Sequence, residues 1–278
     1  RVGIGCGGYL LTEAGFGADM GAERFFNIKC RTSGLRPDAA VLVVTVRALK
    51  THSGRYKIVA GKPLPPDMLA DSPEDVLAGA DNLRKHIEIV RTFGVSPIVA
   101  LNVFPDDHDD EIEAVRRVAE QEGAHFAAST HVVDGGNGAM ELARAVVDAC
   151  DQPTDFRYTY DLADSLETKI EKIATEVYGA DGIDISPQAD KDLAHFEELG
   201  YGRLPVVMAK THLSLSHDPQ LKGRPTGWRL SVREVRAAVG AGYVYAICGN
   251  MRTMPGLGAH PAAERIDIDD NGQVVGLF

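Results

Sequence analysis

The sequence has few of the features that mark secreted or membrane proteins. Its 278 residues include only four cysteines, Cys6, Cys30, Cys150 and Cys248, which lack the close spacing of a zinc site or a disulfide framework. No apolar run approaches the roughly 18 residues that a membrane-spanning helix needs, and no signal-peptide pattern is found at the start. We therefore expect a cytoplasmic protein with reduced cysteines and no membrane partner.

Positive charge is scarce as well. The chain has 29 lysines and arginines against 40 aspartates and glutamates, which gives a formal net charge of −11. A field of this sign repels nucleic acids and anionic membranes, so we expect no nucleic-acid partner. An anionic ligand would have to be met by cations placed next to it.

Several enzyme motifs are absent from the sequence. There is no HExxH, no GxSxG, no GxxxxGK[ST] phosphate loop, and no GxGxxG after an expected strand. His52, His131 and His212 do not stand at metal-ligand spacing with a carboxylate, so we predict no metal site.

The apolar segments that are present alternate between strand and helix patterns. Short β-branched runs such as VLVVTVRAL predict strands buried on both faces. Ser72 suits a helix N-cap, Pro73 the first helical position and Asp75 a capping acid. The expected strands are 41–49, 97–104, 125–129, 156–160, 205–209 and 243–248. The expected helices are 73–92, 109–121, 137–150, 165–178, 187–199 and 232–238.

This order of strands and helices predicts an α/β fold with a parallel sheet. The last residues alternate on both sides of Asn271-Gly272, which predicts a C-terminal β-hairpin. Two long segments, 53–75 and 211–228, fit neither pattern and are expected to be surface loops, which are either functional or plain connections.

Ligands of open α/β sheets bind beyond the carboxyl ends of the strands, so the residues there are the first candidates for a site. Cations and hydroxyl groups at these positions suit phosphate, and aromatic rings suit a flat ligand. Ordinary surface cations and a solvated helix start remain the alternatives. The candidates are Arg47, Lys50, His52, Asn102, Phe104, Asp106, Asp107, Lys210, Thr211, His212, Ser214 and Ser216.

Seven blocks of the sequence, in order, resemble one family, formate–tetrahydrofolate ligase, also called formyltetrahydrofolate synthetase. The blocks are TEAGFGADMGAERFFNIKCR, VTVRALKTHSG, NLRKHIEIVRTFGVSPIVALNVFPDD, GGNGAMELARAVV, YGADGIDIS, GYGRLPVVMAKTHLSLSHDP and TMPGLGAHPAAERIDID with GLF. The resemblance implies ATP-dependent ligation of formate to tetrahydrofolate, in which formate first forms formyl phosphate. The co-substrate is then ATP with Mg²⁺, and a monovalent cation and a homotetramer are further family expectations.

The resemblance also implies roles for individual residues. Phe16 and Phe104 are similar to the aromatics that hold folate, and rings orient a planar ligand at low entropic cost. Val132 stands where the family has tryptophan, so we expect one stacking surface fewer. The segment Thr253, Met254, Pro255, Gly256 and Leu257 resembles a stretch near the nucleotide. Supporting roles are expected for Glu13, Asp19, Arg47, Lys50, Asn102 and Lys210.

Family members are about twice as long as this sequence, and their phosphate-binding loop lies in the half not present here. The chain is thus expected to be the C-terminal half of a larger P-loop-type multidomain enzyme, with no catalytic residues of its own and no turnover alone. We expect residues 1–85 to be the tail of the nucleotide-binding domain and 86–278 to carry the folate and nucleotide walls. The alternatives are a catalytically dead binding or assembly module, or an unrelated α/β nucleotide-binding protein.

Overall fold

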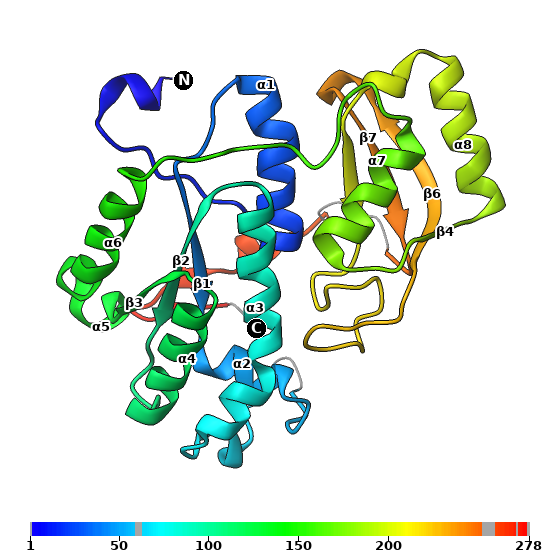
Figure 1. The fold of residues 1–278 in the computed structure, drawn as a ribbon. Helices are drawn as coiled ribbons and strands as arrows, with labels where there is room; N and C mark the ends of the chain where they lie inside the picture. Colours follow the sequence, from blue (N-terminus) through cyan, green and yellow to red (C-terminus); the bar gives the residue numbers. More distant parts are fainter. Residues whose placement is uncertain (1, 59–62, 252–258, 271, 277–278) are drawn as a thin grey trace.

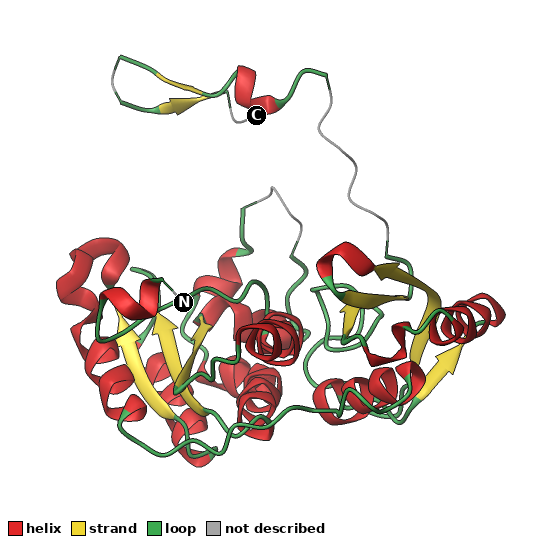
Figure 2. Ribbon diagram, turned by 90° about the horizontal axis from the view of Figure 1, so that it is seen from above, coloured by secondary structure: helices red, strands yellow, loops and turns green. Residues whose placement is uncertain are grey.

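The protein forms two lobes on either side of a pair of central helical segments (Figure 1). The computed structural model describes residues 2–58, 63–251, 259–270 and 272–276. Figure 2 shows the central helices end-on, with one sheet on each side of them. Within these described ranges, no helix is long and apolar enough to cross a bilayer.

The first lobe contains a parallel sheet in the order β1-β2-β3. Helices α3 and α4 pack on one face of this sheet, and α6 covers part of the other (Figure 1). The strands are β1 (Ala39–Val44), β2 (Ser96–Asn102) and β3 (His125–Ser129). The helices are α1 (Arg31–Ser33), α2 (Val46–His52), α3 (Pro73–Thr92), α4 (Asp109–Gln121), α5 (His131–Asp134) and α6 (Met140–Cys150).

The second lobe contains a mixed sheet in the order β4-β6-β7-β5. β6 and β7 are antiparallel, whereas the two outer pairs are parallel. The strands are β4 (Ile183–Ile185), β5 (Val206–Ala209), β6 (Leu230–Ala238) and β7 (Tyr243–Cys248). The helices are α7 (Leu166–Lys172), which continues as a π-helical segment over Ile173–Tyr178, and α8 (Pro187–Glu198).

Helix α3 takes part in both hydrophobic cores. Val76 and Ile87 lie in the core that α3 shares with β1, β2 and α4. Ile89 and Phe93, near the other end of α3, lie in the core of the second lobe, together with Phe26 of the N-terminal helical region. That region begins with two π-helical segments, Ala18–Ala22 and Phe25–Cys30, and runs into α1. A single helix therefore connects the two packed interiors.

The α/β class and most elements are as the sequence predicts. The bounds of α3, α4, β3 and β7 agree with the expected segments, and α8 and β5 differ from them by one residue at an end. The expected hairpin is confirmed as β8 (Asp267–Ile268) paired antiparallel with β9 (Val274–Val275). The expected helix 137–150 begins later, at Met140, after a 3₁₀ turn over Gly135–Ala139.

Two strand predictions are wrong, the first in part and the second entirely. The strand expected over 41–49 ends at Val44, because Thr45 caps a helix by accepting a hydrogen bond from the N–H of Ala48 (3.1 Å). The segment 156–160 is not a strand. Phe156 and Tyr160 are buried, but they pack in the core of the second lobe, and no strand in the described part of the chain pairs with their backbone. The apolar pattern of this segment therefore reflects burial of its side chains and not a strand.

The helix predicted over 232–238 is also wrong, because this segment lies in β6. Its residues form helices readily, but Val232 and Val235 are buried and the backbone pairs with β7. Tertiary pairing outweighs a weak local preference. The short strand β4 was not predicted. The proposed division at residue 85 stays a prediction, and the first sheet takes strands from both sides of it.

Candidate functional site

The first polar cluster lies at the carboxyl ends of β1 and β2. Arg47, in the first turn of α2, places its guanidinium 4.3 Å from the ring centroid of Phe104 and pairs with Asp106 at 3.1 Å. Asn102 ends β2. The Oδ1 of Asn102 and the Nε of Arg47 are buried and have no hydrogen-bond partner in the described part of the chain. This edge therefore offers an aromatic ring and two unused polar atoms.

Lys50 lies one turn further along α2 but points into the protein. Its side chain is fully buried and its ammonium pairs with the Glu111 carboxylate. It also donates to the carbonyl oxygens of Met68 (3.0 Å) and Ala70 (2.7 Å). These contacts fasten α2 to α4 and to the loop before α3. The supporting role expected for Lys50 stays a prediction, and its ammonium is occupied by protein groups.

Val132 lies on the short helix α5 after β3 and is 67% exposed. The neighbouring His131 ring nitrogen Nδ1 is hydrogen-bonded to the hydroxyl of Ser129 (2.9 Å). A valine presents no flat surface, so α5 carries an open aliphatic side chain where the family pattern has an aromatic one.

Phe16 stands in an unusual backbone conformation. It is the one non-glycine residue with a positive φ among those described, at 66°, and a bulky side chain there is strained. Its ring is 66% exposed and stacks on the imidazole of His212, with centroids 4.9 Å apart and planes at 21°. Of the glycines beside it in the sequence, Gly15 has open space around it, whereas Gly17 packs closely against Asp19 and His86. An exposed, strained ring is a feature more typical of binding than of packing.

Asp19 and Lys210 form a buried ion pair between the lobes. Lys210 follows β5, and its Nζ lies 2.6 Å from the Asp19 carboxylate. The same ammonium donates to the carbonyl oxygens of Thr211 (3.1 Å) and Ser214 (2.7 Å) and lies 4.9 Å from the Tyr178 ring centroid. Burial lowers the pKa of Lys210, whereas the Asp19 carboxylate raises it. All three ammonium hydrogens of Lys210 have acceptors in the protein. The ion pair therefore has a structural role, which is to hold the two lobes in position.

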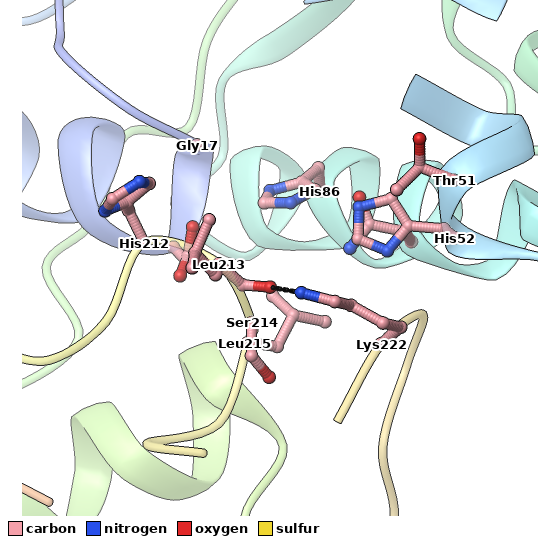
Figure 3. A pocket seen from close by; sticks show the side chains of 11 residues that line it. Gly17, Thr51, His52, His86, His212, Leu213, Ser214, Leu215 and Lys222 are labelled. Carbon is pink, nitrogen blue, oxygen red and sulfur yellow. Dashed lines mark hydrogen bonds between the residues drawn. The ribbon is translucent and has the colours of Figure 1, made fainter. Parts of the chain in front are cut away.

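A cavity of about 200 Å³ lies beside this ion pair (Figure 3). Five segments of the chain line it: the turn at Gly17, the end of α2, the middle of α3, the 212–215 loop, and Lys222. Asn82 and His86, one turn apart on α3, both face it, and His52 faces it from α2. Lys222 reaches across to donate to the carbonyl oxygen of Leu213 (3.0 Å).

Two histidines of this cavity are held neutral near physiological pH. Burial lowers the pKa of His52 to about 4, with smaller contributions from His86 and the Lys222 ammonium. Burial also lowers the pKa of His86, and Lys210 and Lys85 add to this while Asp19 opposes it. The Nδ1 of His52 accepts the N–H of Gly223 (3.0 Å), so neutral His52 carries its proton on Nε2. The Nδ1 of His86 is buried without a partner among the described groups.

The structure brings some predicted site residues together and separates others. Phe16, Asp19, Lys210 and His212 meet around the cavity, whereas Arg47, Asn102 and Phe104 meet at the sheet edge. Glu13 is exposed in the turn before Phe16. The nucleotide segment Thr253, Met254, Pro255, Gly256 and Leu257 lies outside the described residues. Sequence reasoning missed Asn82, His86 and Lys222. The spacing of Asn82 and His86 on one helix face could have indicated these two residues, but not Lys222.

An α/β scaffold with unused polar atoms at its strand ends and a polar cavity between lobes defines a small-molecule-binding protein of the kind found among enzymes. Sequence comparison then identifies the family. The family model for formate–tetrahydrofolate ligase matches residues 1–278, and the chain belongs to this family.

Curated relatives agree with this assignment. The chain is 81% identical over 278 residues to a formate–tetrahydrofolate ligase of Cutibacterium acnes. It is 67% identical over 277 residues to one of Saccharopolyspora erythraea, and 59% identical over 286 aligned residues to formate–tetrahydrofolate ligase 3 of Rubrobacter xylanophilus. Each match covers 100% of this chain but 49–50% of the relative. The chain thus spans about half the length of the curated relatives it matches.

Proposed function

We propose that this chain serves the ATP-dependent ligation of formate to tetrahydrofolate, as part of a protein that also carries phosphoryl-transfer residues. The observation that carries the proposal is the family match over all 278 residues. In the proposed reaction a formate oxygen attacks the γ-phosphate of ATP, which gives formyl phosphate and ADP. N10 of tetrahydrofolate then attacks the formyl carbon, loses a proton and releases phosphate, so that 10-formyltetrahydrofolate forms.

The contribution proposed for this chain is a wall for the folate. Phe16 and Phe104 would stack on its flat rings, and the exposure and strained backbone of Phe16 support this role. The unpaired Oδ1 of Asn102 and Nε of Arg47 would hydrogen-bond polar groups of the ligand beside Phe104. Val132 would contribute an aliphatic contact only. Glu13 and Asp19 are proposed to support the turn that carries Phe16.

The nucleotide is proposed to contact the segment 253–257 and residues that this sequence does not contain. No GxxxxGK[ST] loop occurs in the 278 residues, so we expect this chain alone to turn over nothing. Within the described ranges no group of three metal-ligating side chains could hold an ion. Mg²⁺ is proposed to bind with the ATP phosphates, as a co-substrate expected for the family. A monovalent cation, a homotetramer and a cytoplasmic location are further family-based proposals.

The test is a Phe16→Ala substitution in a full-length formate–tetrahydrofolate ligase, for example at the matching position of the Cutibacterium acnes relative. Losing one stacking contact should raise KM for tetrahydrofolate about two- to tenfold and leave KM for ATP unchanged. The exposed aromatic Tyr9 provides a matched control, because Tyr9→Ala should change neither constant. Equal increases in both KM values for Phe16→Ala would contradict the stacking role.

The second candidate, a catalytically dead binding module, rests on the half-length match. The present chain should then bind tetrahydrofolate, seen as a higher midpoint of thermal unfolding, without any conversion of ATP. If a protein that joins this chain to the other half of a relative produces 10-formyltetrahydrofolate, this candidate is excluded.

A further inference from the structure

The cavity between the lobes contains polar groups that the protein does not use. The Nε2–H of His52 has no acceptor and the Nδ1 of His86 has no partner among the described groups. Lys222 donates one hydrogen to Leu213 and has no carboxylate partner in the described part of the chain. Two donors from separate segments, the Lys222 ammonium and the His52 Nε2–H, thus face one space, with the His86 ring beside them.

Gly17 brings the backbone close to two side chains that line the cavity. A Cβ atom at Gly17 would lie 2.6 Å from the Asp19 Oδ1 and 2.8 Å from the His86 Cε1. Any other residue at this position would force the Asp19 or His86 side chain to move, because contacts this short essentially never occur for real side chains. The remaining space of about 200 Å³ far exceeds the roughly 10–15 Å³ that one water molecule needs.

The Lys222 side of this space is positive. Burial is the main cause of the lowered pKa of both histidines; the Lys222 ammonium lowers the pKa of His52 further, whereas at His86 the Asp19 carboxylate opposes the smaller effects of Lys210 and Lys85. A field that disfavours a positive imidazolium favours an anion at the same place. The Asp19 carboxylate also lines the cavity, and Lys210, at 2.6 Å, offsets part of its negative charge. In a chain with a net charge of −11, the Lys222 ammonium is the local cation that an anion in this space would meet.

We propose that this cavity binds a small oxyanion, a carboxylate or phosphate group, through the Lys222 ammonium and the Nε2–H of His52, with the His86 ring in the cavity wall. Phe16 and His212, stacked beside it, form its aromatic rim. The inference goes beyond the proposed function, because the anion-binding groups of Lys222 and His52 are not part of the folate wall, which shares only the rim residue Phe16. It also predicts that this chain binds the anion without ATP or folate.

The first experiment measures binding to the chain as it is. Sodium phosphate and sodium formate should each raise the midpoint of thermal unfolding more than sodium chloride does at equal ionic strength and near neutral pH. A rise with only one of them identifies the source of the oxyanion as phosphate or carboxylate. A rise no larger than that with chloride overturns the proposal. Neither result bears on the folate wall, since no folate is present.

The second experiment tests the residues. Lys222→Met should weaken phosphate or formate binding about tenfold or more in calorimetry, the effect expected when one charge-assisted hydrogen bond is lost. Lys222→Arg should retain most of the affinity. Lys191, an exposed lysine on α8, serves as the matched control, and Lys191→Met should bind as the parent does. If Lys222→Met binds equally well, the site is elsewhere.

A third measurement needs no variant. In ¹⁵N-labelled protein, the side-chain resonances of His52 and His86 should shift on addition of phosphate or formate, and those of the exposed His260 should not. Saturation of the shifts at the dissociation constant found by calorimetry supports the proposal. Unchanged resonances of His52 and His86 would contradict it even if Lys222→Met were unstable.

Discussion

The two polar regions of this protein are built in different ways. The sheet-edge cluster of Arg47, Asn102 and Phe104 uses residues that follow neighbouring strands, and its ion pair is partly exposed, with the Asp106 side chain 61% exposed. The cavity between the lobes draws on five separate segments and rests on the fully buried pair of Asp19 and Lys210.

This difference indicates that the sheet-edge cluster is a binding surface, whereas the residues of the cavity region also hold the fold together. At the sheet edge, the strands fix the positions and the side chains are free to serve a ligand. Between the lobes, the charged groups also hold the lobes together, because Lys210 reaches from the second lobe to the N-terminal helical region. Mutations should therefore disturb stability far more in the cavity region than at the sheet edge.

The largest effect is expected for Lys210→Met. The substitution leaves the Asp19 carboxylate buried without a partner, which should lower the free energy of unfolding by about 3–5 kcal/mol. Urea denaturation measures this loss. Adding Asp19→Asn to Lys210→Met should recover part of it, and Lys191→Met should stay within about 0.5 kcal/mol of the parent. A loss below about 1 kcal/mol for Lys210→Met would show that the pair does not hold the lobes.

The next effect is a pH dependence from Glu23, which lies under the same region. Glu23 is fully buried, its Oε1 accepts a hydrogen bond from Asn27 (2.8 Å), and burial raises its pKa from 4.5 to about 7. The folded protein therefore holds this proton more tightly than the unfolded chain. The resulting stabilisation, on the order of 3 kcal/mol, is full below about pH 4.5 and is lost as the pH rises through about 7.

Urea denaturation across this pH range, with Glu23→Gln as the test variant, checks the assignment. The variant should lose this part of the pH dependence, because its amide does not titrate. Glu13→Gln, at an exposed position, is the control and should keep the dependence of the parent. An unchanged slope for Glu23→Gln would assign the titration to another group.

The smallest effect is expected at the sheet edge. Asp106→Ala removes a largely exposed ion pair with Arg47 and should change the free energy of unfolding by no more than about 1 kcal/mol. Arg47→Ala also removes the contact with the Phe104 ring and should cost about 0.5–1 kcal/mol more. A loss as large as that of Lys210→Met would remove the contrast between the two regions.

Local patterns in the sequence were sufficient for much of the first lobe. Helices α3 and α4 and strand β3 have strong periodicity or clear start signals, so their bounds followed from neighbouring residues. Strand-end reasoning also located Arg47, Asn102 and Phe104, because parallel strands bring their carboxyl ends to one edge. Where structure follows from residues close in sequence, the sequence predicts it.

The wrong or missing predictions concern structure that depends on residues far apart in the sequence. β6 is a strand because β7 and β4 lie beside it, and the segment at Phe156 is buried without being a strand because it packs on Phe26. The cavity combines Gly17, His86 and Lys222, which are far apart along the chain. No local pattern encodes such a meeting, so only the assembled lobes reveal it.

The shared helix α3 has a consequence for how the protein can be dissected. The two ends of α3 lie in different hydrophobic cores. Dividing the chain on either side of α3 would therefore expose apolar side chains such as Ile87 or Phe93 to water. The two lobes should melt as one cooperative unit, and expressing either lobe alone should give an aggregation-prone product. Anyone designing a split reporter or a shortened version of this protein should keep residues 73–92 intact and in contact with both partners.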